Sequence, residues 1–134
     1  MSLVEEIRGR LLKYPDVRYE TVDNRIRVLP ASEHGFEVQL FEPENNYYMV
    51  FFNGWHEDFT ESDRALDCFA LGLSTQCRLL EYRRRDYAYK WVLEVKRPAG
   101  WVRQSVTALI FFPFWRKRKV RVLQNQLLRE KDSS

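Results

Sequence analysis

The sequence predicts an α+β fold, in which mainly antiparallel sheet in two hairpin-rich halves of about four strands packs against two main helices. The length of 134 residues is typical of one domain, so we expect a single α+β domain over residues 1–134. Hydrophobic residues make up 45% of the chain, which is enough for a core and excludes disordered and low-complexity classes. Helical patterns alternate with hairpin-like runs, and the short connections between runs favour antiparallel pairing.

The first predicted element is a helix that begins after Ser2. Ser2 can cap the helix, and Glu5, three residues later, completes a capping box. Pro15 ends the helix because proline cannot continue its hydrogen bonds. The apolar positions recur at helical spacing and are Leu3, Ile7, Leu11 and Tyr14.

Two hairpins are predicted after this helix. Residues 17–22 and 25–28 form the first, with a tight turn at residues 23–24. Residues 36–40 alternate apolar and polar side chains, and residues 47–53 are a run of β-forming residues. Because both faces of 47–53 are apolar, we expect this strand to be central and covered on both sides.

A second helix is predicted over residues 60–75. Thr60 is the expected cap, and Asp63 lies in the first turn, where a negative charge is favoured. One stripe of this helix is apolar, and its members are Ala65, Leu66, Phe69, Ala70 and Leu73. We expect the stripe to lie on the sheet.

The remainder of the chain predicts strands again. Residues 77–84 and 87–96 form a hairpin, and the second of these strands alternates apolar and charged residues. Residues 101–112 predict a further strand that Pro113 ends. A basic strand over residues 117–124 follows, and then a short C-terminal helix. The predicted order is α-β4-α-β4, and we expect the strands to pair as an antiparallel meander throughout.

The net charge of +3 hides a division along the chain. Residues 1–75 contain 7 Lys/Arg and 14 Asp/Glu, which gives −7, whereas residues 76–134 contain 15 and 5, which gives +10. The basic half could attract an anionic partner. Alternatively, the two halves could neutralise each other across a sheet edge or a dimer interface.

Two cysteines, Cys68 and Cys77, are too few for a disulfide framework, so we expect reduced thiols and a cytoplasmic protein. The N-terminus lacks the basic and apolar segments of a secretory signal. The longest apolar run, residues 106–115, is about half of the roughly 20 residues that span a bilayer, so no membrane span is expected. The five glycines are scattered, which excludes phosphate-binding loops, and we expect no cofactor.

The densest polar cluster lies in residues 53–59, which we expect to form a loop before the second helix. His56 beside Glu57 and Asp58 could act as a general base oriented by a carboxylate. No metal site is expected, because His34 is the only other histidine and zinc sites on helices use histidine pairs. The alternative interpretation is structural, since acidic residues before a helix favour its dipole.

A basic and aromatic segment covers residues 111–121. Aromatic rings beside cations suit single-stranded nucleic acid or an anionic membrane surface. The alternative is protection of an exposed strand edge by charge. Together with Trp55, the binding candidates of this segment are Trp115, Arg116, Lys117, Arg118, Lys119 and Arg121.

These patterns predict a non-enzymatic protein-binding or chaperone-like domain that forms a homodimer. Four tryptophans and seven tyrosines are a composition typical of interfaces, and no enzyme motif is complete. Two alternatives remain open. One is a nucleic-acid or anionic-surface binder that uses residues 111–121, and the other is a hydrolase or lyase that uses His56 with Glu57 or Asp58.

Overall fold

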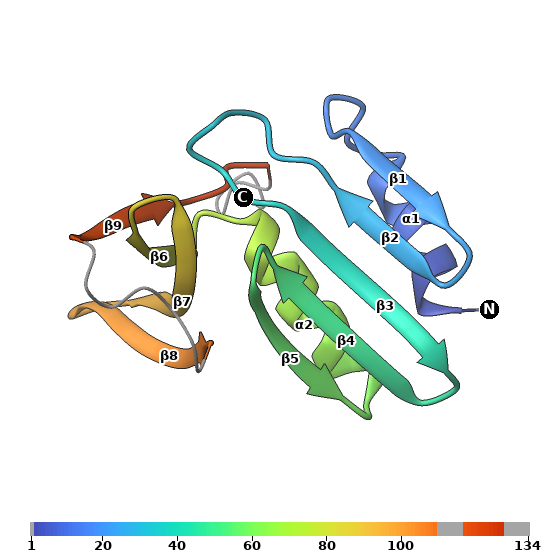
Figure 1. Cartoon of the computed structure of the whole chain (residues 1–134). Coiled ribbons are helices and arrows are strands. Elements are labelled where there is room, and N and C mark those ends of the chain that lie inside the picture. The colour runs from blue at the N-terminus through green and yellow to red at the C-terminus, as the bar shows by residue number, and fades with distance from the viewer. Residues whose placement is uncertain (1, 110–116, 128–134) are drawn as a thin grey trace.

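The computed structural model describes residues 2–109 and 117–127 of the chain and confirms the α+β class with antiparallel sheets. Within these residues lie two helices, a five-stranded sheet and a four-stranded sheet (Figure 1). In chain order the elements are α1 (Leu3–Leu11), β1 (Tyr19–Val22), β2 (Arg25–Val28), β3 (Val38–Glu44), β4 (Tyr47–Phe52), β5 (Trp55–Phe59), α2 (Ser62–Leu73), β6 (Cys77–Arg84), β7 (Tyr87–Arg97), β8 (Gly100–Ala108) and β9 (Arg118–Leu123). Neither helix has the length or the apolar composition to cross a membrane.

The first sheet has the order β1-β2-β3-β4-β5, and all its strands are antiparallel to their neighbours. Both helices lie on the same face of this sheet, behind the strands in Figure 1, and they contact each other. The predicted capping box of α1 is present, because the Ser2 hydroxyl accepts from the Glu5 amide and the Glu5 carboxylate accepts from the Ser2 amide. Within the described residues, no helix lies on the opposite face of this sheet.

The second helix starts two residues later than predicted. Its N-cap is Glu61, whose side chain makes no capping hydrogen bond, so the prediction of Thr60 as the cap was wrong. Thr60 is not the N-cap because it directly follows the end of β5 and lies two residues before the first residue of α2. Ala65, Phe69 and Leu73 are buried, and α2 contacts β3, β4 and β5.

Residues 55–59 form a strand, where the sequence predicted a loop. The first half therefore contains five strands and not four. The turn between β4 and β5 is Asn53-Gly54, and Asn53 has a positive φ of 52°. An Asn-Gly pair between β-forming residues is a strong hairpin signal, because asparagine tolerates the positive φ that a tight turn needs. This signal in the sequence favours a hairpin over the predicted loop.

The prediction that residues 47–53 are covered on both sides was also wrong. Tyr48, Val50 and Phe52 are buried beneath the helices, whereas the alternate residues of β4 are only half-buried. β4 lies between β3 and β5, so its backbone is paired on both edges while one of its faces remains open. A strand that is apolar on both faces is thus not evidence of two covering layers.

The second sheet has the order β8-β7-β6-β9. β9 pairs with β6 and not with its sequence neighbour β8, so the predicted meander fails at this strand. The predicted strand over residues 101–112 ends at Ala108 within the described part of the chain. Residues 124–127 form no helix, and most of the predicted C-terminal helix lies outside the described residues.

One continuous hydrophobic core connects the two sheets. Trp91 of β7 lies against Gly54, where a Cβ atom would stand 2.3 Å from the indole ring. Only glycine therefore fits at this close approach without displacing the ring. Asn125, which is buried, accepts from the Phe36 amide and donates to the carbonyls of Phe36 and Gly72. Asn125 thereby attaches the segment after β9 to the residues just before β3 and to α2.

Candidate functional site

The alternation of β5 separates the three residues proposed as a catalytic group. His56 and Asp58 lie on the face without helices, because they pair with Phe51 and Met49 of β4. Glu57 lies on the other face of the strand, since successive side chains of a strand point to opposite sides. The structure therefore places His56 and Asp58 on one face and separates both from Glu57.

The surroundings of His56 and Asp58 are those of a sheet surface. The imidazole ring lies 5.6 Å from the Phe51 ring, centroid to centroid. Asp58 accepts a hydrogen bond of 2.7 Å from the Tyr47 hydroxyl, and this bond raises the pKa of Tyr47. Within residues 2–109 and 117–127, no three His, Cys, Asp or Glu side chains are grouped so that they could hold a metal ion.

Trp55 belongs to the core. It is fully buried, and its ring stacks on Phe52 with the ring centroids 4.7 Å apart. Its indole N–H donates to the Ser105 hydroxyl at 2.6 Å, and the His56 amide donates to the Thr107 hydroxyl at 3.3 Å. These bonds join the edge of the first sheet to β8.

The predicted basic segment is described only from Lys117 onward, and Trp115 and Arg116 lie outside the described residues. Lys117, Arg118, Lys119 and Arg121 are exposed. The Arg118 guanidinium lies 5.4 Å from the Tyr82 ring centroid, and Arg121 Nε lies 3.8 Å from a Glu81 carboxylate oxygen. The cations of β9 thus line the edge strand of the second sheet.

The charge division of the sequence is also a division in space. The described part of the second half contains twelve Lys/Arg and three Asp/Glu, which gives a net charge of +9. Each ion pair between described residues joins two residues of the same half. Neutralisation between the halves by ion pairs is therefore not seen within the described part of this chain.

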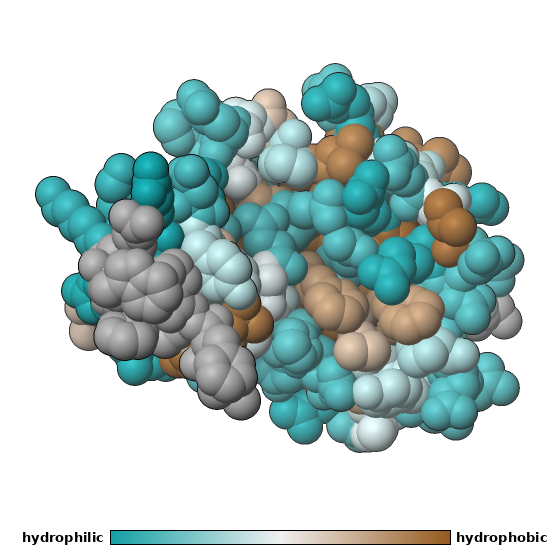
Figure 2. Space-filling view, viewed as in Figure 1, coloured by the Kyte–Doolittle hydropathy of each residue, from teal (hydrophilic) through white to brown (hydrophobic). Residues whose placement is uncertain are grey.

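The face of the first sheet that carries no helix is called the open face here. Its central residues form two rows across β2, β3, β4 and β5, as the strand register shows. The first row is Arg25, Phe41, Met49 and Asp58, and the second row is Arg27, Gln39, Phe51 and His56. Figure 2 shows this face, with moderately hydrophobic side chains gathered over β3 and β4 and hydrophilic side chains around them.

Arg25 is held flat on the open face. Its guanidinium lies 4.5 Å from the Phe41 ring centroid and 5.8 Å from that of Phe51, and it donates to the Gln39 side-chain oxygen at 2.7 Å. Arg27, in contrast, pairs with Glu20 at 2.6 Å and with Glu37 at 3.4 Å. Among the described residues, no carboxylate pairs with Arg25.

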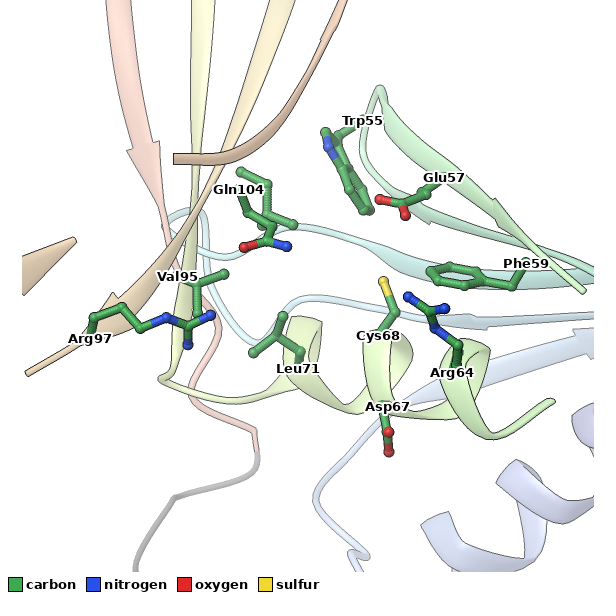
Figure 3. Close-up of a pocket in the computed structure, with 11 residues that line it drawn as sticks. Trp55, Glu57, Phe59, Arg64, Asp67, Cys68, Leu71, Val95, Arg97 and Gln104 are labelled. Atoms are coloured by element: carbon green, nitrogen blue, oxygen red, sulfur yellow. The ribbon is translucent and has the colours of Figure 1, made fainter. Parts of the chain in front are cut away.

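A cleft of about 380 Å³ lies where α2 and β5 meet the second sheet (Figure 3). Its floor is apolar and includes Trp55, Leu71 and Val95. Charged and polar side chains stand at the rim, namely Glu57, Arg64, Asp67, Arg97 and Gln104. A floor and rim of this kind can hold a small molecule, but the rim contains both signs of charge and defines no ligand class.

The one nucleophilic side chain among the residues lining this cleft is Cys68, whose sulfur points into the space between α2 and β5 (Figure 3). Burial, together with the nearby Glu57 carboxylate, raises the pKa of this thiol far above its ordinary value. The thiol is therefore neutral at physiological pH, and a neutral thiol is a poor nucleophile.

Sequence reasoning missed the central residues of the open face, which are Arg25, Phe41, Met49 and Phe51. In the structure, residues 38–41 and 47–52 alternate between buried and half-buried side chains, but the sequence of 47–52 is apolar throughout and does not indicate which face the helices cover.

No protein-family model, no curated protein and no solved structure matches this chain.

Proposed function

We propose that the protein is a non-enzymatic protein-binding domain and that its partner contacts the open face. The observation that carries this proposal is the apolar centre formed by Phe41, Met49 and Phe51 on a sheet face that neither α1 nor α2 covers. These three side chains are half-buried, and their remaining exposed surface is the area that a partner would bury.

The composition of the open face supports a protein partner. Aromatic residues, methionine and arginine are enriched in protein interfaces, and polar groups typically surround such a centre. Here the Arg25 guanidinium lies over Phe41, and Asp58 pairs with Met49 at the edge strand β5. The Arg25 contacts with Phe41 and Gln39 hold the side chain in place, which lowers the entropy cost of binding.

The geometry favours binding over catalysis. The strand alternation separates Glu57 from His56, and burial keeps the Cys68 thiol neutral. A general base also needs a substrate position within hydrogen-bonding reach, and His56 lies on a sheet surface beside the Phe51 ring.

A phage-displayed library of random peptides tests the proposal. We expect enriched peptides to bind the wild-type protein and to lose at least tenfold in affinity for Phe41→Asp and Met49→Asp, because a buried unpaired carboxylate opposes an apolar contact. Val102→Asp is the matched control, since Val102 is exposed on β8 of the second sheet. Enriched peptides that bind all three variants as tightly as the wild type would contradict the proposal.

A second candidate function is binding of a polyanion by β9 and its neighbours. The net charge of +9 in the described part of the second half favours it. Replacing Lys117, Arg118 and Lys119 by Gln should then make the salt dependence of binding to single-stranded oligothymidine shallower by about 2 to 3 units of slope. Vesicles of phosphatidylserine form the second arm of this test. If the variant shows the same salt dependence of binding as the wild type, these cations would instead protect a strand edge.

A cytoplasmic location is part of the same proposal. Cys68 and Cys77 are free thiols, which accords with a reducing compartment.

A further inference from the structure

The first row of the open face has an order of charges that is complementary to the same row of a second copy turned around. Arg25 is cationic, Phe41 and Met49 are apolar, and Asp58 is anionic. Register places these residues side by side on four consecutive strands, about 4.8 Å apart from strand to strand. The row therefore runs from positive through apolar to negative across the sheet.

A two-fold axis parallel to the strands, between β3 and β4, would lay two open faces on each other. This rotation reverses the order of strands while it keeps each row opposite itself. The backbone position of Arg25 in one copy then faces that of Asp58 in the other, and Phe41 faces Met49; the Arg25 guanidinium, which lies over Phe41 in the single chain, would extend towards that carboxylate. Because the operation is two-fold, each of these contacts occurs twice.

The other two-fold arrangement is unfavourable. An axis perpendicular to the strands would keep β2 opposite β2, so that Arg25 and Arg27 would meet the same two arginines of the second copy. Like charges at a closed interface cost free energy, whereas opposite charges fix orientation. The charge order of the row thus selects one axis.

We infer that the occupant of the open face is a second copy of this chain, in a symmetric dimer whose sheets stack face to face with Arg25 opposite Asp58. This inference rests on the proposed protein-binding function and names its partner. Two sheets that stack in this way lie about 10 Å apart with strands crossing at about 30°, a spacing that the half-buried Phe41 and Met49 side chains can fill.

The hydrogen-bonding capacity that Arg25 and Asp58 leave unused supports this assignment. Arg25 has a planar guanidinium on the sheet surface with no carboxylate partner among the described residues. Asp58 accepts from Tyr47 through Oδ2. A guanidinium and a carboxylate of this kind form directional hydrogen bonds, which gives register as well as attraction.

Charge reversal tests the inference, with sedimentation equilibrium of the full chain as the measurement. Arg25→Asp and Asp58→Arg should each raise the dimer dissociation constant about tenfold, because each change places like charges opposite each other at two positions. Arg64→Asp is the control, since Arg64 is exposed on α2, away from the open face. This control should leave the association of the wild type unchanged.

Mixing the two variants gives the decisive result. One Arg25→Asp chain and one Asp58→Arg chain restore opposite charges at both positions, so the mixture should form a heterodimer with an affinity near that of the wild type. A wild-type chain that stays monomeric, or a dimer that ignores both reversals, overturns the inference. If the monomer still binds selected peptides through Phe41 and Met49, the proposed function stands while the second copy is rejected as the partner.

Discussion

The five-stranded sheet and the four-stranded sheet differ in what covers their buried faces. α1 and α2 lie along one face of the first sheet and contact β2, β3, β4 and β5. The second sheet contacts the edge strand β5 and the end of α2, and within the described residues no helix runs along it. The first sheet therefore has a two-layer core of its own. The second sheet depends on the region where it contacts β5 and α2, which is called the joint here.

This difference has a consequence for the exposed surfaces. Both helices lie on one face of the first sheet, so neither of them covers the open face. In the second sheet, the joint uses Trp91 against Gly54 and the hydrogen bonds of Asn125. Its charge is strongly positive and its ion pairs stay within its own half, as they do in the first half.

The largest expected effect on stability comes from shortening one large side chain in the core of the first sheet. Phe69 is buried on α2, and Phe69→Ala should reduce the free energy of unfolding by about 3 to 5 kcal/mol. Because the second sheet depends on the first, urea unfolding followed by near-ultraviolet circular dichroism should show both sheets lost together. A loss below about 1 kcal/mol would mean that α2 does not hold the first sheet.

A smaller effect is expected at the joint. Asn125→Ala removes three hydrogen bonds to buried backbone groups and should cost about 2 to 3 kcal/mol, since unsatisfied buried groups are expensive. Hydrogen exchange should accelerate more in β6 and β7 than in β3 and β4. Gln126→Ala is the control, because Gln126 is exposed. Equal acceleration in both sheets would remove the distinction between them.

A pH dependence is expected from Cys77, which lies at the start of β6. Burial raises the pKa of Cys77 to about 12. The unfolded thiol ionises near pH 8.5 while the folded thiol stays neutral, so stability is lost as the pH rises from there towards 12. Between pH 8.5 and 9.5 this loss amounts to about 1 kcal/mol.

Cys77→Ala isolates this contribution from other groups that titrate in the same range. The variant should be less stable at pH 7 because a buried side chain is shortened, but its stability should fall less steeply with pH than that of the wild type. Thermal unfolding at a series of pH values measures both. Parallel curves for the two proteins would show that the thiol is not shielded from water.

The smallest effect is expected at the surface of α1. Arg10 pairs with Glu6 at 2.9 Å; the Arg10 side chain is exposed and that of Glu6 is half-buried. Glu6→Ala should change the free energy of unfolding by no more than about 0.5 kcal/mol, as exposed pairs one helical turn apart usually do. A larger loss in urea unfolding would show that α1 contributes to the first sheet through its charges as well as its apolar side.

The sequence predicted most elements because each carries a local signal. The Ser2 and Glu5 capping box fixes the start of α1, and the apolar stripe with Phe69 identifies α2. β5 was missed because the polar residues 56–58 resemble a loop, and the Asn53-Gly54 turn was not used. The pairing of β9 with β6 depends on contacts far apart in the sequence, which no local pattern encodes.

The candidate site was harder to predict for a physical reason. Whether Phe41 and Phe51 are core or surface depends on which face the helices occupy, and α1 and α2 could have covered either side or both. The cluster of His56, Glu57 and Asp58 was proposed from adjacency in sequence, but a strand points adjacent side chains to opposite faces. Residues that are adjacent in sequence can be assigned to one site only when the local secondary structure, and so the direction of each side chain, is known.

Chemical-shift mapping by NMR during dilution tests the central claim most directly, namely that the open face is the contact surface. Dilution from high concentration should shift the resonances of Phe41, Met49 and Phe51 and those of their strand neighbours, while β6 and β7 stay constant. A uniform set of shifts in β8 and β9, with β3 and β4 unchanged, would place the contact on the second sheet and contradict the account.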